Sequence, residues 1–206
     1  MASDGVGLLG SGGHADEVSA VLGQAVEFRA VSKQYIHGAG MIDIESPGEY
    51  VKASVNAAVG APFVRKKLVD LWPGDDYAVV VADSAIIGPN TKIGKGTYVA
   101  HGAILTTDII LGEHVLVNVG SSLSHGVRCG DYATISPGVH VGGNVKVGRG
   151  VFIGIGATIT NNVKIADGVV LGAGAVLIGD ADVENGVYVG LPAKLLKVNP
   201  DWLHEI

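Results

Sequence analysis

Two places in the chain carry residue types suited to binding or catalysis. The run GSGGHA at residues 10–15 has the form G-x-G-x-x-A, and it stands between a predicted strand and a predicted helix. Backbone amides at the start of a helix can face phosphate, so this turn either holds a nucleotide diphosphate or simply packs the helix against the strand. The second place is His125, a lone imidazole inside a long aliphatic pattern, and an imidazole can accept a proton near neutral pH.

The segment that carries His125 repeats every six residues from residue 79 to residue 192. The third position of each hexad is aliphatic, apart from Cys129, and the first position is always Ala, Val, Ile, Thr or Ser. This pattern predicts a short strand that fills a core, followed by a turn rich in Gly, Asn and Asp. Three hexads then form one coil of a parallel β-helix, in which Cys129 is predicted to be a small buried hydrophobe.

The length of a coil predicts which residues stack on one another. Residues that are 18 apart in the sequence should lie in one column, separated by about 4.8 Å. His125 and Gly143 then share one edge of the β-helix, and Ile155 and Ala173 form a column of their own.

The first 78 residues alternate between strand and helix patterns. Residues 6–10, 26–31 and 53–60 are predicted strands, and residues 15–23 and 61–72 are predicted helices. This alternation predicts a small, Rossmann-like α/β domain with a parallel sheet. A dinucleotide site would carry an acidic residue after the second strand, but Ser32 and Lys33 stand there, so NAD is disfavoured as a ligand.

The composition limits the classes of partner. The formal net charge is −6 and there is no long basic run, so nucleic acid is disfavoured as a partner. No stretch approaches the roughly 20 apolar residues that cross a bilayer, and the first residues lack the features of a secretory signal. A single cysteine cannot form an internal disulfide. We therefore expect a cytoplasmic protein without a membrane span.

Three features together resemble a known family. They are the GSGGHA turn in a small N-terminal domain, the segment AVGAPFVRKKL at residues 58–68, and an unbroken hexapeptide solenoid that ends in VYVGLPAK at residues 187–194. This combination resembles the sugar O- and N-acyltransferases of the NeuD/PglD family over almost the whole chain. The resemblance implies a left-handed parallel β-helix, a homotrimer and acetyl-CoA as the cosubstrate.

The resemblance also implies roles for individual residues. His125 is the expected general base, Asn118 is expected to line the acyl-transfer site, and the amide of Gly143 is expected to contact the acyl group. The expected coenzyme contacts are Thr134, Gly143, Ile155 and Ala173. The expected contacts of a nucleotide-linked substrate are Gly12, Gly13, His14, Ser32 and Gly60. His14 is as well suited to capping the helix as to contacting a substrate phosphate. Arg65 is as well suited to a structural ion pair as to contacting the nucleotide.

Two positions depart from the pattern of these relatives. Relatives usually carry Asp or Glu directly after the general base, where it raises the basicity of the imidazole, but this chain has Gly126. Asp108 lies 18 residues before Gly126, so we hypothesise that it supplies the carboxylate from the neighbouring coil. Relatives often have a second histidine where this chain has Thr134, whose hydroxyl still offers the coenzyme a hydrogen bond.

The sequence therefore predicts an acetyl-CoA-dependent acetyltransferase that acts on a nucleotide-linked amino sugar in polysaccharide or glycan synthesis. The alternatives are an O-acetyltransferase of sialic acid or another sugar, and a non-catalytic trimeric scaffold that binds sugar nucleotides. A zinc-dependent carbonic anhydrase is disfavoured, and no metal is expected, because His101, His114, His125 and His140 lack the spacing of that site. We expect residues 1–78 to bind the nucleotide, residues 79–192 to form the acyltransferase domain and residues 193–206 to cap it.

Overall fold

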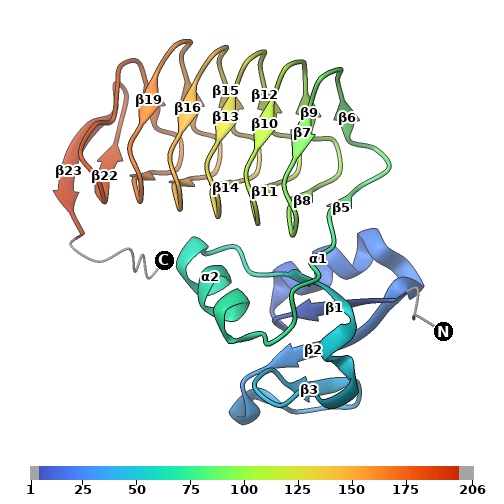
Figure 1. The fold of residues 1–206 in the computed structure, drawn as a ribbon. Helices are drawn as coiled ribbons and strands as arrows, with labels where there is room; N and C mark the ends of the chain where they lie inside the picture. The colour runs from blue at the N-terminus through green and yellow to red at the C-terminus, as the bar shows by residue number, and fades with distance from the viewer. Residues whose placement is uncertain (1–4, 200–206) are drawn as a thin grey trace.

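The computed structural model describes residues 5–199, which form an α/β unit and a β-helix (Figure 1). The α/β unit contains β1 (Val6–Leu9), α1 (Gly13–Leu22), β2 (Val26–Val31), β3 (Met41–Asp43), β4 (Ser54–Ala57) and α2 (Pro62–Leu71). Short 3₁₀ helices span Gly23–Ala25, Lys33–Tyr35 and Gly48–Lys52. α1 ends at Gly23, whose φ of 61° suits glycine, and α2 begins with Pro62, whose missing N–H costs nothing at a first helical position.

The four strands of this unit form one parallel sheet in the order β3-β2-β1-β4. The predicted strands and helices are all present. The sequence missed β3, because its three residues are too few to show a period. Since β1 lies between β2 and β4, the chain leaves β1 toward one side and reaches β4 on the other, and ligands of parallel sheets bind at the carboxyl ends of strands at such a reversal.

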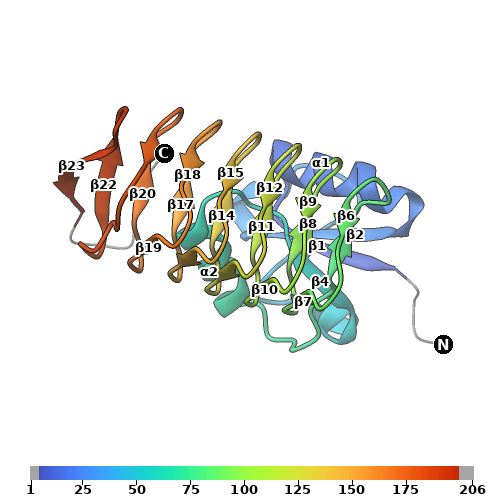
Figure 2. The ribbon, with the colours of Figure 1, turned by 90° about the horizontal axis from the view of Figure 1, so that it is seen from above.

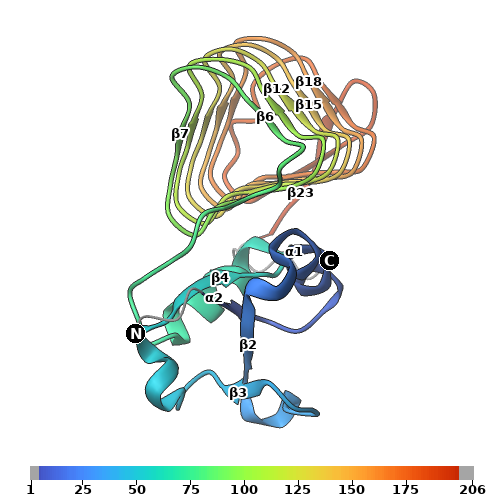
Figure 3. The same cartoon turned by 90° about the vertical axis from the view of Figure 1, so that its right-hand side faces the viewer.

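The β-helix is built from three parallel sheets, one on each side of its triangular coils (Figures 1–3). The β8 face contains β5 (Val80–Val81), β8 (Tyr98–Val99), β11 (Leu116–Val117), β14 (Thr134–Ile135), β17 (Phe152–Ile153), β20 (Val170–Leu171) and β22 (Gly186–Val189). The β9 face contains β6 (Ile86–Ile87), β9 (Ile104–Leu105), β12 (Ser122–Leu123), β15 (His140–Val141), β18 (Thr158–Ile159) and β21 (Val176–Leu177). The β10 face contains β7 (Lys92–Ile93), β10 (Ile110–Leu111), β13 (Arg128–Cys129), β16 (Lys146–Val147) and β19 (Lys164–Ile165).

The predicted stacking interval is confirmed through most of the β-helix. Ser122 pairs with His140, Thr134 pairs with Phe152, and every other pair from β5 to β21 is also 18 residues apart. The third residues of the hexads form the core, including Cys129, which is 4% exposed. Burial raises the pKa of the Cys129 thiol to about 12, so this cysteine is a core residue, as predicted.

The prediction of an unbroken register is wrong at the last coil. Leu171 pairs with Tyr188 rather than with Val189, so the final turn is one residue shorter, and Tyr188 fills the core where Val189 was expected. The first coil also differs, because Ile87 is 39% exposed although it occupies an inward position. No earlier coil covers it, whereas inward residues in the middle of the β-helix are covered on both sides.

The α/β unit packs against the β8 face, the lower side of the triangle in Figure 3. Leu8, Ala15 and Val18 form a buried cluster with Tyr98 and Leu116 of that face. At the other end, β23 (Lys194–Val198) pairs antiparallel with β22. Residues 1–4 and 200–206, including half of the expected C-terminal cap, lie outside the described residues. Within residues 5–199, neither helix has the length and apolar character needed to cross a membrane.

Candidate functional site

His125 and Gly143 lie on successive coils at one edge of the β-helix, where the chain turns from the β9 face to the β10 face. We call this edge the His125 corner. The amide of Asn144 donates to the carbonyl of His125 at 2.8 Å, which fixes the two coils in register. A Cβ atom built on Gly143 would lie 2.5 Å from both Cε1 and Nε2 of His125. The imidazole therefore stands directly over Gly143, and a side chain at this position would require the imidazole to move.

The imidazole of His125 is exposed and makes no side-chain hydrogen bond to any residue between 5 and 199. Gly126, which follows it, has a φ of 72°, and a Cβ there would lie 2.4 Å from Oδ1 of Asn144. A side chain at position 126 would therefore require the carboxamide of Asn144 to move. The imidazole is thus free to contact a substrate, and no side chain among residues 5–199 orients it through a hydrogen bond.

Asp108 occupies the column of Gly126, as predicted, but its carboxylate has other partners. Its Oδ1 accepts from Asn90 at 2.9 Å, and its Oδ2 accepts from Thr107 at 3.1 Å. Within the described chain no hydrogen bond joins Asp108 to His125. The structure therefore offers no support for the hypothesis that Asp108 orients the imidazole, and that role stays a prediction.

The amide of Gly143 already has an acceptor. Its N–H donates to Oδ1 of Asn161 at 2.8 Å, and Asn161 is the next residue of the same column. Asn161 is not among the predicted site residues, although the same interval of 18 residues that links His125 to Gly143 leads on to it.

Asn118, Ile155 and Ala173 lie at a different edge, where the chain turns from the β8 face to the β9 face. We call it the Ile155 corner. Ile155 is 62% exposed, its carbonyl accepts from Gly174 at 2.8 Å, and Ala173 is also exposed. Oδ1 of Asn118 accepts from the adjacent amide of Val119 at 2.7 Å. The β9 face separates this edge from His125, so one protomer does not bring these residues together with the histidine.

The prediction that Thr134 contacts the coenzyme is wrong. Thr134 is 2% exposed, because the α/β unit covers its part of the β8 face. Its hydroxyl donates to the carbonyl of Gly60 at 2.8 Å and accepts from Arg65 at 2.9 Å. Both hydrogen-bonding functions of the hydroxyl are therefore used to join the two parts of the chain.

Arg65 is the centre of this junction. It is 1% exposed, and burial lowers its pKa to about 9, so the guanidinium stays charged at neutral pH. It makes hydrogen bonds rather than the ion pair that the sequence suggested. The acceptors are the carbonyls of Val59, Gly60, His114, Tyr132 and Ala133 and the hydroxyl of Thr134. A buried cation needs such a complete shell of acceptors.

His114 lies beside Arg65 between two tyrosine rings. It stacks on Tyr132 at 5.0 Å between ring centroids and meets Tyr77 edge to face at 4.7 Å. Burial, together with the charges of Arg65 and Lys95, lowers the pKa of His114 to about 4. The ring is therefore neutral at physiological pH and belongs to the junction, not to a catalytic site.

The predicted nucleotide contacts gather at the carboxyl edge of the α/β sheet. Gly12 and Gly13 start α1 after β1, Gly60 follows β4, and Ser32 follows β2. A Cβ at Gly12 or Gly13 would meet no protein atom within 4 Å, so these two glycines leave open space at the helix start. The free amides of a first helical turn suit a phosphate there.

His14 is less exposed than its position in the first turn suggests. Its Nδ1 hydrogen bonds with Glu17 at 2.9 Å, and its ring meets Tyr98 of the β8 face edge to face at 5.2 Å. Burial lowers the pKa of His14, since the neighbouring Glu17 only partly offsets it. His14 therefore lies between the α/β unit and the β-helix. No side chain makes a capping hydrogen bond at the start of α1, where Gly12 is the N-cap residue, so His14 does not cap this helix.

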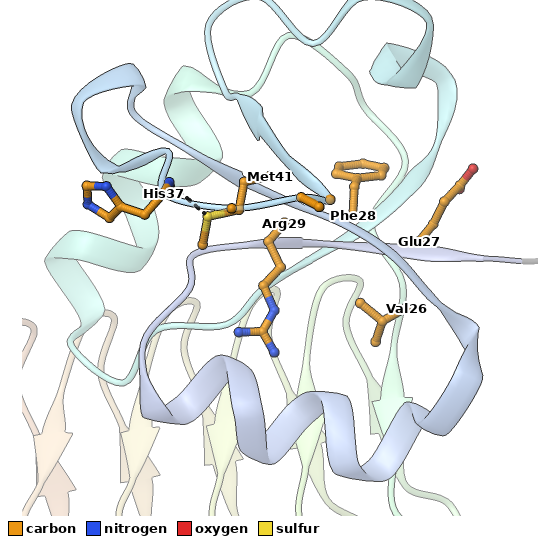
Figure 4. Close-up of a pocket in the computed structure, with 9 residues that line it drawn as sticks. Val26, Glu27, Phe28, Arg29, His37 and Met41 are labelled. Carbon is orange, nitrogen blue, oxygen red and sulfur yellow. Dashed lines mark hydrogen bonds between the residues drawn. The ribbon is translucent and has the colours of Figure 1, made fainter.

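An open hollow of about 460 Å³ lies at the amino ends of β2 and β3, away from the glycine turn (Figure 4). Val26, Phe28 and Met41 supply its apolar walls, and the amide of His37 donates to Sδ of Met41. Arg29 is turned toward α1, where it binds Asp16 at 2.8 Å. None of the predicted site residues lines this hollow.

Comparisons with known proteins agree with this architecture. Residues 144–179 match the family described as bacterial transferase hexapeptide (six repeats), whereas no curated protein sequence matches the chain. The acetyltransferase domain of PglB from Neisseria gonorrhoeae is 25% identical with a TM-score of 0.84, over 94% of this chain and 100% of that domain. WeeI from Acinetobacter baumannii has a TM-score of 0.73 at 24% identity, over 93% of this chain and 99% of its own.

A third relative is known with its ligands. It is GDP-perosamine N-acetyltransferase from Caulobacter crescentus, solved with CoA and GDP-perosamine in a variant that replaces one histidine by alanine. It is 25% identical with a TM-score of 0.83, over 94% of this chain and 97% of that chain. The chain therefore has the fold of these hexapeptide-repeat sugar acetyltransferases and resembles them over almost its whole length. The His125 corner and the glycine turn are its two candidate functional regions.

The junction around Arg65 predicts a measurable role for Thr134. In Thr134→Val the side-chain shape is kept, but Gly60 and Arg65 each lose a partner inside a buried network. We expect a loss of about 1–3 kcal/mol in the free energy of unfolding. Thermal or urea unfolding measures it, with Thr106→Val at an exposed position as the matched control. Equal stability of the two variants would contradict the role of this network.

His114 predicts a loss of stability in acid. Its pKa of about 4 in the folded protein lies below the unfolded value of 6.5, so the unfolded chain binds more protons between these pH values. Lowering the pH through this window therefore favours unfolding, by up to about 3 kcal/mol for this group. Because His114 has a φ of 54°, Asn is the suitable replacement. The melting temperature of His114→Asn should fall less steeply from pH 6.5 to pH 4 than that of the unchanged protein, and parallel curves would contradict the assignment.

Proposed function

We propose that this protein transfers an acetyl group from acetyl-CoA to a nucleotide-linked amino sugar, with His125 as the general base. The observation that carries the proposal is the imidazole of His125 standing over the backbone of Gly143 at an exposed edge. A relative of the same fold binds CoA and GDP-perosamine, which supports the choice of both substrates. Synthesis of a surface polysaccharide or glycan in the cytoplasm is the process that fits them.

The proposed chemistry is a direct transfer. The amine of the sugar attacks the thioester carbonyl while Nε2 of His125 removes its proton. The carbonyl oxygen becomes an oxyanion, which the N–H of Gly143 stabilises. The C–S bond then breaks, and the thiolate of coenzyme A takes the proton back from the imidazolium. Asn118 is proposed to line the acyl-transfer site. Asp108, in the column of Gly126, is proposed to supply the carboxylate that orients the imidazole of His125.

The α/β unit is the proposed nucleotide-binding domain, over residues 1–78. Gly12, Gly13 and His14 supply the start of α1, and Gly60 and Ser32 supply the neighbouring strand ends. The strand order reverses between β1 and β4 at this edge, which supports a phosphate site there. Residues 79–192 are the proposed acyltransferase domain, and residues 193–206 are its proposed cap.

The separation of the two corners supports a homotrimer. His125 and Gly143 can meet Ile155 and Ala173 only if another protomer brings its Ile155 corner to the His125 corner. The β9 face joins the two corners and exposes Ile86, which is 60% exposed, and Ile104, which is 38% exposed. Burial of this face against two other copies would place acetyl-CoA between protomers. The catalytic base would then be shielded from water on one side.

Replacing His125 tests the proposed function. Since the ring is exposed and has no hydrogen bond within the described chain, His125→Ala should keep its melting temperature and lose about 10²–10⁴-fold in kcat. His37→Ala, at another exposed histidine, is the control. The assay follows release of free coenzyme A from acetyl-CoA with a panel of nucleotide-linked amino sugars and free sialic acid. Turnover with sialic acid alone would identify an O-acetyltransferase, and no turnover with any acceptor would favour a binding scaffold.

The trimer predicts a mass of three times 20.9 kDa by light scattering. Ile86→Asp combined with Ile104→Asp places charges on the β9 face, and it should give monomers that have lost acetyl transfer. The control is Lys92→Asp on the β10 face, which should remain trimeric. A fully active monomer would contradict a site shared between protomers.

A further inference from the structure

At the His125 corner, the backbone N–H of Gly143 has two candidate acceptors, the acyl oxygen of the substrate and Oδ1 of Asn161. The proposed function assigns the N–H of Gly143 to the acyl oxygen, but in this structure the N–H donates to Oδ1 of Asn161 at 2.8 Å. Asn161 is exposed and stands on the coil after Gly143, while His125 stands on the coil before it. An acyl oxygen that binds Gly143 must therefore displace the carboxamide oxygen of Asn161.

The same kind of bond occurs at the corner between the β10 and β8 faces, but with a different side chain. There the amides of Glu113 and Arg149 donate to Asp131 and Asp167, both at 2.8 Å. A carboxylate can only accept hydrogen bonds, whereas the carboxamide of Asn161 also carries an NH₂ group with two donors. Because a backbone N–H can only donate, the atom that faces Gly143 must be Oδ1, and Nδ2 is turned away from the amide.

We propose that Asn161 supplies a second hydrogen-bond donor to the acyl oxygen. When the thioester carbonyl takes the N–H of Gly143, the released carboxamide rotates and its Nδ2 donates to the same oxygen. The developing oxyanion then has two donors, Gly143 and Asn161, and His125 stands on the opposite side of Gly143 to move the proton. This inference rests on the proposed function, and it makes Asn161 a catalytic residue.

The position of Asn161 explains how one backbone amide can serve both fold and catalysis. A buried or half-buried N–H without a partner is costly, and Asn161 satisfies that of Gly143 in the absence of an acyl group. After the exchange the amide of Gly143 still has an acceptor, because the acyl oxygen replaces Oδ1 there, and this oxygen gains a further bond from Nδ2. A carboxylate at this position would instead repel the oxyanion.

The decisive variant is Asn161→Asp, which keeps the size of the side chain and the acceptor for Gly143 but removes both donors. We expect kcat for acetyl transfer to fall about 100-fold, with a smaller change in KM for acetyl-CoA. Asn161→Ser, which has a hydroxyl that can both accept and donate, should retain more activity than Asn161→Asp. The control is Asp167→Asn, the reverse exchange at the other corner, which should leave kcat unchanged.

A binding measurement separates this inference from the proposed function. Calorimetry with acetyl-CoA and with coenzyme A compares ligands that differ only in the acyl group, and Asn161→Asp should weaken acetyl-CoA about tenfold relative to coenzyme A. Wild-type kcat together with an unchanged affinity ratio in Asn161→Asp would overturn the inference. If the wild-type protein binds acetyl-CoA but transfers no acetyl group, only the proposed function is contradicted. The ratio of the affinities for acetyl-CoA and coenzyme A in Asn161→Asp would still decide whether Asn161 binds the acyl oxygen. Absence of acetyl-CoA binding would overturn both.

Discussion

The stacking of 18-residue coils is the constraint on which the site depends. Each strand from β5 to β21 has only two residues, so a coil is held mainly by hydrogen bonds to the coils on either side and by the inward residues that they cover. This register sets a residue on each edge directly above another. It brings the imidazole of His125 over the backbone of Gly143 and the carboxamide of Asn161 to the other side, without any long loop to position them.

The second constraint is the buried guanidinium of Arg65. It ties the turn at Gly60 to the carbonyls of Tyr132 and Ala133 on the β-helix, and Thr134 adds a bond to the same turn. The edge of the α/β sheet that we assign to the nucleotide is thereby held at a fixed place over the β8 face. A substrate whose sugar must reach a catalytic corner needs its nucleotide anchored in this way, because the distance between anchor and base decides which group is presented.

Much of this arrangement was predictable from the sequence because the repeat is strict. The hexads predicted the β-helix, the burial of Cys129 and the pairing of His125 with Gly143, since a fixed period converts sequence separation directly into position. The prediction failed where interactions between distant segments decide the outcome. Thr134 has an outward position that would be exposed on a bare β-helix, and only the packing of the α/β unit buries it. Tyr188 displaces the expected Val189 because the last coil is shortened, which the repeat does not signal.

The expected coenzyme contacts are divided between two corners of the β-helix, so a complete site requires two copies of the chain. In the proposed site, His125, Gly143 and Asn161 form the reactive edge of one protomer, and Ile155 and Ala173 of a neighbour form the opposite wall. The most direct test is a crystal structure of the protein with acetyl-CoA. We predict that the thioester carbonyl lies about 3 Å from the N–H of Gly143, beside Asn161 and against a second protomer. Acetyl-CoA bound elsewhere, for example in the hollow at the amino ends of β2 and β3, would contradict this site.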